Sequence, residues 1–485
     1  MTKTFHGGIK KQKKLFSPVP VEGSVEIKEG CSFAYTASES NGICVDVGER
    51  VYAGTVLACC EGAAPLLSGV SGTVTSIEAD RIVVAADKER ESLPALPPFE
   101  RALSDISAEE TAVRLFDCAV TSRYSLGGVF LDCDSARALS SEKKIRLIID
   151  CSSPSVTSSV NSFLIKHYPA ELGGGIRILM RACNASEAHL VCDNSSVDII
   201  RILESLCDGK HVRLSVAEAK YPMQNEGLLL YLAIDKEISR KKRATDYGFV
   251  TVDCEAAVNA YRATVLGERT VTKHVCVKRG NGIECVNAPL GTPISALIAE
   301  DESSAFFATE ELPVTVKPAS DAENDFISQS SDVIAFVKES AGDSACGCIG
   351  CGKCEAACPM YLPVSRIAPP QFGDLQKIYE KYSFDACIGC GCCSAVCPSG
   401  IEIRKYIERG RSGNENLLFV EEYKKRRSFV GNKSGYSDSV ATLGILGGLC
   451  SRNACCPADA CFRSDLCYRR RSGRRTVKKE AFVLP

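Results

Sequence analysis

The sequence predicts a multidomain chain of mixed α/β and α+β class that carries a small helical domain built around two cysteine runs. Three observations predict this class. With 485 residues the chain is too long for a single hydrophobic core. Its middle part alternates apolar strand-like stretches with helix-like stretches. Two runs of the form C-x2-C-x2-C-x3-C-P begin at Cys348 and Cys387.

The N-terminal part is expected to hold residues 1–30 as a leading segment and residues 31–100 as a domain of short strands. Val45–Leu57 and Ser68–Ile77 are apolar stretches punctuated by glycine, a pattern typical of the barrel-sandwich hybrid of lipoyl and biotinyl carriers. Those carriers attach their cofactor to a lysine at a hairpin tip. The intervening stretch Ala58–Leu67 contains no lysine, so we expect a structural module rather than a swinging arm.

Residues 112–245 are predicted to form a layered α/β domain with a largely parallel, Rossmann-like sheet. Helix-like stretches at 159–168 and 196–206 alternate with apolar stretches at 145–149, 176–182, 188–192 and 212–216. Such sheets bind nucleotides at the carboxyl ends of their strands. The glycines available to approach a phosphate are Gly127–Gly128 and Gly173–Gly175, and a plain turn is an equal alternative for both because neither forms G-x-G-x-x-G.

Three further regions follow. Residues 248–312 are expected to form a small α+β module with strands at 249–253 and 269–277, and the polar, acidic residues 313–343 a linker. Residues 344–415 form the predicted cluster domain. The tail, 416–485, contains a basic block at 469–479 and five cysteines outside any ferredoxin spacing, Cys450, Cys455, Cys456, Cys461 and Cys467. We expect it to be poorly ordered, with a metal site or a contact for an acidic partner or anionic lipid as alternatives.

The two cysteine runs have the spacing with which bacterial two-cluster ferredoxins hold [4Fe-4S] cubanes. Three close thiolates bind one cube, and the fourth, just before the proline, crosses to the other. We therefore assign one cluster to Cys348, Cys351, Cys354 and Cys397, and the other to Cys387, Cys390, Cys393 and Cys358. The alternative is two structural zinc sites, but zinc sites pair two separated C-x2-C units, whereas three ligands crowd together here. Cys346 and Cys392 are surplus and are expected to pack nearby without ligating; the alternative is that either one replaces an assigned ligand if the register is off by one.

Composition limits the remaining functions. The chain has 58 Lys and Arg against 60 Asp and Glu, so its net charge of -2 gives no electrostatic case for nucleic-acid binding. Its opening residues form no apolar signal-peptide core, and we expect most of the other twenty of its 28 cysteines to be small buried groups in a reducing cytoplasm. The longest apolar candidate, Val440–Leu449, is too short to span a bilayer. We expect any membrane association to run through a partner.

From Phe5 to about Arg411 the order of parts resembles the C subunit of Rnf electron-transport complexes. The matching pieces are Phe5-His-Gly-Gly8, the glycine-punctuated strands, Gly174–Met180, Lys220-Tyr-Pro222, Gly291-Thr-Pro293, Cys358-Pro-Met360 and the paired cysteine runs. The resemblance implies a peripheral cytoplasmic subunit with a complex I 51 kDa-like α/β domain, a soluble-ligand-binding β-grasp (SLBB-like) module and two cubanes. It also implies FMN, a nicotinamide site, ferredoxin-like electron carriers, and membrane subunits that couple ferredoxin and NAD redox chemistry to ion transport.

The chain departs from the family at the flavin loop. The family reads close to Gly-x-Gly-Gly-Ala-Gly-Phe-Pro, where this chain has Tyr124–Asp132 with only Gly127 and Gly128. The family's acidic Asn-Gly-x-Glu-x-Glu-Pro segment is replaced by Asp150–Ser155, without either glutamate. The resemblance implies bound FMN. Because backbone amides must approach its phosphate closely, these changes in the loop argue against FMN binding. We therefore expect NADH binding to be weak or absent and electrons to pass through protein partners at the cluster domain.

Three functions of different classes remain open from the sequence. The first is an electron-relay subunit of an Rnf-type complex. The second is a self-contained flavoenzyme, such as an NADH-dependent or cobalamin-reductase-like protein, which requires bound flavin. The third is a non-catalytic scaffold in which the clusters serve stability alone.

Overall fold

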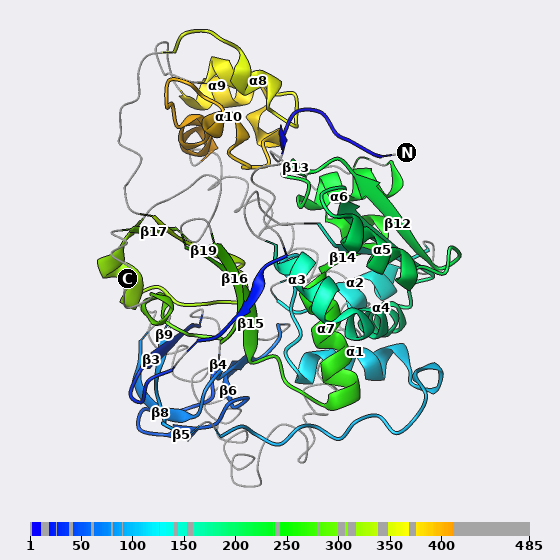
Figure 1. Ribbon diagram of the computed structural model, residues 1–485, viewed down its shortest axis with the longest axis vertical. Coiled ribbons are helices and arrows are strands. Elements are labelled where there is room, and N and C mark those ends of the chain that lie inside the picture. Colours follow the sequence, from blue (N-terminus) through cyan, green and yellow to red (C-terminus); the bar gives the residue numbers. More distant parts are fainter. Residues whose placement is uncertain are drawn as a thin grey trace, which may run out of the picture.

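A computed structural model describes residues 2–10, 19–25, 27–37, 42–59, 63–78, 81–89, 91–125, 127–139, 144–152, 159–235, 237, 243–279, 282–298, 306–308, 317–337, 348–367 and 375–411. These residues form a mixed α/β molecule of several parts, with the α/β part on the right-hand side of Figure 1. The tail cysteines, its basic block and the apolar candidate at 440–449 lie outside the described residues. Within the described residues no helix is both long and apolar enough to cross a membrane.

The α/β part contains a four-stranded, fully parallel sheet in the order β12-β11-β10-β14. Its strands are β10 (Arg146–Asp150), β11 (Glu187–Asp193), β12 (Val212–Ala217) and β14 (Phe249–Asp253). β10, β11 and β14 are buried almost throughout, as expected for a sheet covered on both faces. Leu147 and Ile149 of β10 point into one core, and Ile148 points into the core on the opposite face.

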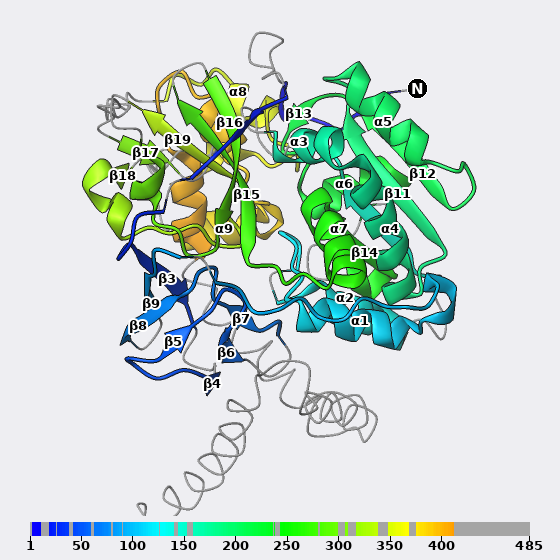
Figure 2. The same cartoon turned by 60° about the horizontal axis from the view of Figure 1, so that its bottom comes forward.

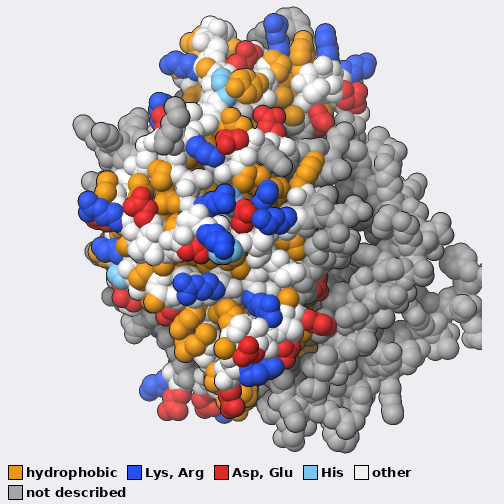
Figure 3. All heavy atoms as spheres, turned by 90° about the vertical axis from the view of Figure 1, so that its right-hand side faces the viewer, with side chains coloured by type: hydrophobic (Ala, Val, Ile, Leu, Met, Phe, Trp, Pro, Cys, Tyr) orange, Lys and Arg blue, Asp and Glu red, His pale blue; other side chains and the backbone are white. Residues whose placement is uncertain are grey.

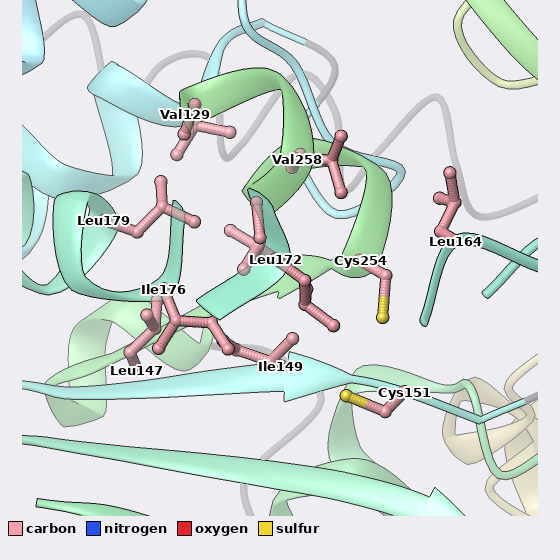
Figure 4. Packing of buried hydrophobic residues seen from close by; sticks show 14 of the residues in the cluster. Val129, Leu147, Ile149, Cys151, Leu164, Leu172, Ile176, Leu179, Cys254 and Val258 are labelled. Carbon is pink, nitrogen blue, oxygen red and sulfur yellow. The ribbon is translucent and has the colours of Figure 1, made fainter. Parts of the chain in front are cut away.

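The helices that cover this sheet in the described part of the chain are α1 (Ala108–Asp117), α2 (Val129–Leu139), α3 (Val160–His167), α4 (Pro169–Cys183), α5 (Val197–Leu206), α6 (Glu226–Ile234) and α7 (Cys254–Tyr261). Helix α6 packs with Ile148 on one face of the sheet. On the other face α4 and α7 pack with Leu147 and Ile149, as Figure 4 shows. Helix α1 begins with a capping box in which Ser107 and Glu110 exchange hydrogen bonds. Ser196 accepts from the Ile199 amide and caps α5.

Three expectations for this region were wrong. The stretch at 176–182 is not a strand, and Gly173–Gly175 are neither a turn nor a phosphate loop, because all of them lie inside α4. Gly174 and Gly175 let α4 approach α7: a Cβ atom on Gly175 would lie 1.7 Å from the Ala257 carbonyl oxygen. In addition, β14 pairs with β10, so the parallel sheet continues beyond residue 245 and takes in a strand expected in the next module.

A six-stranded sheet follows, in the order β18-β17-β19-β15-β16-β2. Its strands are β2 (Val21–Gly23), β15 (Thr272–Arg279), β16 (Gly282–Pro289), β17 (Phe306–Ala308), β18 (Lys317–Pro318) and β19 (Val333–Val337). The expectation of a linker over 313–343 was therefore wrong, since β18 and β19 lie in the sheet. The N-terminal strand β2 runs along β16 at the sheet edge (Figure 2).

The N-terminal strands form two small sheets. One has the order β3-β9-β8-β5, and the other the order β4-β6-β7. Their strands are β3 (Ser32–Thr36), β4 (Gly42–Ile43), β5 (Arg50–Val51), β6 (Val56–Cys59), β7 (Leu66–Leu67), β8 (Gly72–Ile77) and β9 (Arg81–Ala86). They enclose their own core around Phe33, Leu57 and Ile82. Gly69 fits closely against the Leu290 backbone and ties this part to the loop after β16.

The cysteine runs lie in a small domain of short helices, α8 (Lys353–Ala356), α9 (Leu375–Lys381) and α10 (Cys392–Ala395). Its core is built from Val364, Phe384 and Ile407 together with several cysteines. The domain sits at one end of the molecule, and the N-terminal segment passes beside it (Figure 1). There β1 (Ile9–Lys10) pairs with β13 (Lys220–Tyr221) of the α/β part.

Most described cysteines outside the two runs are buried, as expected. Cys133 of α2 and Cys183 of α4 differ from the expectation of free thiols because they form a disulfide. Cys151 and Cys254 lie next to one another in the core at the ends of β10 and β14 (Figure 4).

Candidate iron-sulfur site

The two cysteine runs adopt the same backbone conformation. In each run the two glycines have positive φ angles between 68° and 73°, which residues other than glycine rarely adopt. These glycines are Gly350, Gly352, Gly389 and Gly391. The turn that each first glycine makes aims its amide at the sulfur of the first cysteine. These N-to-Sγ distances are 3.5 Å to Cys348 and 3.3 Å to Cys387. Both loops thus present amide hydrogens to thiolate sulfur, which is how proteins hold and tune iron-sulfur clusters.

The cysteine before each proline lies near the opposite run. Burial raises the pKa of Cys358, and its thiol is further influenced by Cys390 and Cys387. Burial likewise raises the pKa of Cys354, which is influenced by Cys397. A small cavity in the domain is lined by five cysteines, which are the four assigned to the second cluster and the surplus Cys392. Met360, Val364, Arg404 and Ile407 also line it. Eight thiols in this crossed arrangement are a donor set that fits two cubanes.

Cys392, one of the two surplus cysteines, is fully buried and supports its neighbour. Its thiol donates to the Tyr221 carbonyl over 3.9 Å. Hydrogen bonding with the side chain and the backbone amide of Cys392 lowers the pKa of Cys390. A thiolate is the form of cysteine that binds iron, so Cys392 favours the ligating state of Cys390. Cys346, the other surplus cysteine, lies outside the described residues.

Tyr221 joins the cluster domain to the α/β part. Its hydroxyl donates to the Cys390 carbonyl over 2.9 Å, and its ring packs with Ala357 and Cys392. The sequence marks this tyrosine only through the Lys220-Tyr-Pro222 match, in which the Tyr221-Pro222 bond is cis. The contact with Cys390 was not expected.

The N-terminal motif reinforces the same junction. The Gly8 amide donates to the Ala357 carbonyl over 2.9 Å, and the His6 ring stacks on Tyr361 at 3.7 Å between centroids. At Gly7, which has φ 61°, a Cβ atom would lie 2.8 Å from the Cys358 carbonyl carbon. The Phe5-His-Gly-Gly8 segment therefore needs its glycines to run beside the crossing cysteine of the first run.

Within the described residues no group of three or more His, Cys, Asp or Glu side chains is arranged around a point where a single metal ion fits. A cubane holds its thiolates at separate corners of a cube and therefore needs a more widely spaced set of ligands than one ion does.

The sheet edge where nucleotides commonly bind is filled here by the chain's own side chains. At the carboxyl end of β10, Asp150 accepts hydrogen bonds from the Tyr124 hydroxyl at 2.8 Å and the Ser152 amide at 2.9 Å. At the end of β14, Asp253 accepts from Ser122 at 3.0 Å and from the Arg123 amide at 2.8 Å. Burial raises the pKa of Tyr124 and of Asp150. These buried groups bind each other at the place where a nucleotide is expected.

The amides near Gly127 and Gly128 are also engaged within the protein. The Gly128 amide donates to the Ser125 carbonyl at 3.0 Å, and the Val129 amide donates to the Val120 carbonyl at 3.1 Å. The Gly127 carbonyl accepts from Ala64 at 2.6 Å. A phosphate cradle needs free amides at a helix N-terminus, and these two already have partners. In the described part of this loop, the residues do not fit an FMN phosphate.

A buried ionic cluster lies beside this edge. The Lys273 ammonium contacts Glu255 and lies 3.4 Å from Asp332, while the His274 amide donates to Glu255 at 2.7 Å. Burial alone would raise the pKa of Glu255, but Lys273 and His274 bring it to about 2. Because this pKa is depressed, the carboxylate contributes stability above its unfolded value of about 4.5, and that stability is lost as the pH falls toward 2.

Glu255→Gln is therefore expected to lower the free energy of unfolding by about 3–5 kcal/mol, because it removes the main partner of a buried lysine. Asp198→Asn, which breaks the solvent-exposed pair with Arg201 on α5, is the control and should cost less than about 1 kcal/mol. Urea unfolding followed by circular dichroism at pH 7 measures both. Equal midpoints for the two variants would contradict the assigned importance of Glu255.

Two family models match parts of the chain. Residues 347–401 match the 4Fe-4S dicluster domain, and residues 134–262 match the Nuo51 FMN-binding domain. Over 349 residues the chain is 25% identical to the C subunit of the ion-translocating oxidoreductase complex of Klebsiella pneumoniae, and the match covers 66% of this chain and 44% of that protein. The chain is similar to the C subunit of Rnf complexes. The match to the 4Fe-4S dicluster domain confirms the iron-sulfur cofactors that the cysteine spacing predicts.

Two further relatives come from other bacteria. The C subunit of the proton-translocating ferredoxin:NAD(+) oxidoreductase complex of Clostridium ljungdahlii is 22% identical over 411 residues, covering 79% of this chain and 88% of that protein. The C subunit of the Na(+)-translocating complex of Acetobacterium woodii is 23% identical over 329 residues, covering 63% and 72%. The chain spans less than half of the Klebsiella pneumoniae relative and 62% of the one from Rhodobacter capsulatus.

A solved structure, the NAD+-reducing [NiFe]-hydrogenase in the H2-reduced state, overlaps with this chain at a TM-score of 0.44. It is 12% identical, and the overlap covers 67% of this chain and 63% of that one. At this level the overlap supports no argument on function.

Proposed function

We propose that this chain is an electron-transfer subunit that relays electrons through two [4Fe-4S] clusters, as the peripheral C subunit of an Rnf-type ion-translocating ferredoxin:NAD oxidoreductase complex. The observation that carries the proposal is the crossed pair of matching loops, in which Cys358 lies with the second run and Cys397 with the first. Two neighbouring cubanes supply one-electron transfer and no bond-making chemistry. The relatives' names extend this to a complex with further subunits.

The ligand sets are part of the proposal. One cluster is assigned to Cys348, Cys351, Cys354 and Cys397, and the other to Cys387, Cys390, Cys393 and Cys358. All four members of the second set line one cavity, which supports this division; Cys392 lines it too, but its thiol donates to the Tyr221 carbonyl. The chain's own groups orient the ligands: the glycine amides point at sulfur, Cys392 favours the thiolate of Cys390, and Tyr221 fixes the second loop on the α/β part.

The types and limits of the individual domains are also part of the proposal. The two small sheets of residues 31–100 suit a barrel-sandwich hybrid without a swinging lysine, and the six-stranded sheet suits an SLBB-like β-grasp. We place the end of the Rossmann-like domain near residue 262, where the FMN-binding model ends, and extend the β-grasp to residue 337. The cluster domain keeps its expected limits of 344–415.

The proposed partners are ferredoxin-like electron carriers and the membrane subunits of the complex, which place this chain at the cytoplasmic face of the membrane. The face shown in Figure 3 has lysine, arginine and acidic side chains interspersed among neutral atoms. A surface of this kind suits protein partners better than the phosphate backbone of a nucleic acid.

A second candidate, a flavin-dependent NADH oxidoreductase, is favoured by the match to the Nuo51 FMN-binding domain. The amides of Gly128 and Val129 weigh against it, because both donate to the protein itself. A third candidate, a scaffold stabilised by clusters, has no supporting contact of its own. Electron paramagnetic resonance of dithionite-reduced protein, flavin fluorescence of the same sample, and co-purification with membrane subunits separate the three.

Anaerobic titration with NADH is expected to leave the visible absorbance of the clusters unchanged, whereas dithionite bleaches it. The physical reason is the filled sheet edge at Asp150 and Asp253 and the engaged amides beside Gly128. The same titration followed by flavin fluorescence reports any bound FMN. Rapid, stoichiometric bleaching by NADH would show that a working flavin and nucleotide site persists around Gly127 and Gly128.

A further inference from the structure

We infer that two charged side chains shift the reduction potentials of the two clusters in opposite directions. Arg404 raises the potential of the cluster in the Cys387 loop, and Glu355 lowers the potential of the cluster in the Cys348 loop. Together they offset the unequal exposure of the two loops to water. This inference rests on the proposed function and adds the residues that bring the two cubanes toward a common potential.

The two loops differ in exposure although their backbones match. Cys348 and Cys351 are exposed, whereas the equivalent Cys387 and Cys390 are half-buried. Uptake of one electron makes a cubane and its four thiolates more negative, and water stabilises the added charge, so exposure raises the potential. Exposure alone would therefore give the cluster of the Cys348 loop the higher potential.

The same pair of positions is in contact beside each loop. Glu355 and Ser394 each follow the third ligating cysteine of their run, and Ser365 and Arg404 each lie seven residues after the crossing cysteine. The Ser365 hydroxyl donates to the Glu355 carboxylate, and the Arg404 amide donates to the Ser394 hydroxyl at 3.0 Å. The first loop thus has a carboxylate where the second has a neutral serine. The second loop has a guanidinium where the first has a neutral serine.

The helical residues 403–411 place a positive face on the second loop. Arg404 and Ile407 line the small cavity together with the four cysteines assigned to the second cluster. Arg411 lies on the same helix face and donates to the Cys387 carbonyl at 2.9 Å. The guanidinium of Arg404 therefore lies beside the place where the second cubane would be held.

The two charges act on ligands of different clusters. Arg404 interacts electrostatically with Cys390, and Glu355 interacts electrostatically with Cys354. A positive charge stabilises the more negative, reduced state of a neighbouring cluster, and a negative charge destabilises it. Arg404 therefore favours reduction of the second cluster, and Glu355 disfavours reduction of the first. Both effects oppose the difference that exposure produces.

The remaining charges near the two runs are more exposed. Glu408 pairs with the Nε atom of Arg404 at 2.5 Å, and its side chain is 48% exposed against 26% for Arg404. Water and salt screen exposed charges, so these change a cluster potential less than half-buried charges do. The other exposed charged residues close in sequence to the runs are Lys353, Arg366, Asp385, Glu402 and Lys405.

The test is a redox titration of the anaerobic full-length protein, followed by electron paramagnetic resonance. Cys351→Ser leaves the second cluster as the reporter, and Cys390→Ser leaves the first. Added to Cys351→Ser, Arg404→Gln is expected to lower the ratio of reduced to oxidised second cluster about tenfold at a fixed potential. This corresponds to a midpoint about 59 mV lower for a one-electron couple. Added to Cys390→Ser, Glu355→Gln is expected to raise the ratio for the first cluster about threefold to tenfold.

Matched variants separate charge from structure. Arg404→Lys keeps the positive charge and should restore most of the midpoint, whereas a purely structural role of Arg404 would leave it lowered. Lys405→Gln removes the same charge from the next, exposed residue and should change the ratio less than twofold. Glu408→Gln removes the carboxylate that opposes Arg404 and should raise the midpoint of the second cluster, opposite in sign to Arg404→Gln.

The same titration of the two-cluster protein keeps every ligand in place. Its two midpoints should lie closer together than those of the double variant Arg404→Gln/Glu355→Gln, in which the first cluster becomes the higher. Unchanged midpoints in both single variants, or equal shifts of both clusters, would overturn the inference and leave the two cubanes intact. A wild type without cubane signals would instead refute the proposed function.

Discussion

Cys390→Ser is expected to lower the iron content of anaerobically purified protein from about eight to about four atoms per chain, because each cubane contains four irons. It should also loosen the cluster domain from the α/β part. The second loop touches Tyr221 through the Cys390 carbonyl, and metal ligation contributes directly to the folding of so small a domain. Iron analysis, paramagnetic resonance and limited proteolysis between the two parts measure these effects.

Cys351→Ser is the matched control, since it takes the same position in the other motif. It should remove the same amount of iron but leave the junction resistant to protease, because the exposed first loop makes no equivalent contact with the α/β part in the described residues. Stoichiometric zinc without a brown chromophore in the wild-type protein would refute the iron-sulfur ligands altogether.

Gly175→Ala is expected to destabilise the α/β part by about 3 kcal/mol or more, the upper range of overpacking effects. The added methyl carbon would lie 1.7 Å from the Ala257 carbonyl oxygen, so α4 and α7 must move apart. The helix propensity gained by replacing a helical glycine, about 1 kcal/mol, is too small to offset this movement.

Gly173→Ala tests the same helix at a more tolerant position. Its Cβ atom would approach only the end of the Leu206 side chain, at 3.0 Å, and that side chain is able to turn away. We expect a change within about 1 kcal/mol, since the gain in helix propensity compensates for the shift of Leu206. Thermal unfolding by circular dichroism compares the two, and equal midpoints would show that the two helices separate at little cost.

Short-range sequence signals predicted the parts of this molecule that short-range chemistry decides. The cysteine spacing identified the iron-sulfur domain because a cubane demands ligands at fixed intervals. The buried strand at 145–149 was visible because a parallel strand covered on both faces is apolar throughout. The run at Gly173–Gly175 misled the prediction, since adjacent glycines usually mark turns. Within the helix, the contact with Ala257 explains Gly175, and the contact with Tyr261 explains Gly174.

The errors at 248–253 and 313–343 have a different origin. Strand β14 pairs with β10 across about a hundred residues of chain, and no local pattern records such a partner. Strand β19 is an apolar pentapeptide within a polar, acidic stretch whose average composition hides it. Tyr221 was visible only as part of a short match, because its function depends on a loop that the chain reaches 169 residues later.

The N-terminal segment imposes an order on the assembly of this protein. The ribosome makes this segment before the parts that it contacts. Strand β1 pairs with β13, β2 pairs with β16, and the Gly8 amide donates to the Ala357 carbonyl. Each partner emerges more than two hundred residues later, so the separate cores must form while this segment remains unbound. The contact between Gly8 and Ala357 is the last of the three that synthesis makes possible, because Ala357 follows β13 and β16 in the chain.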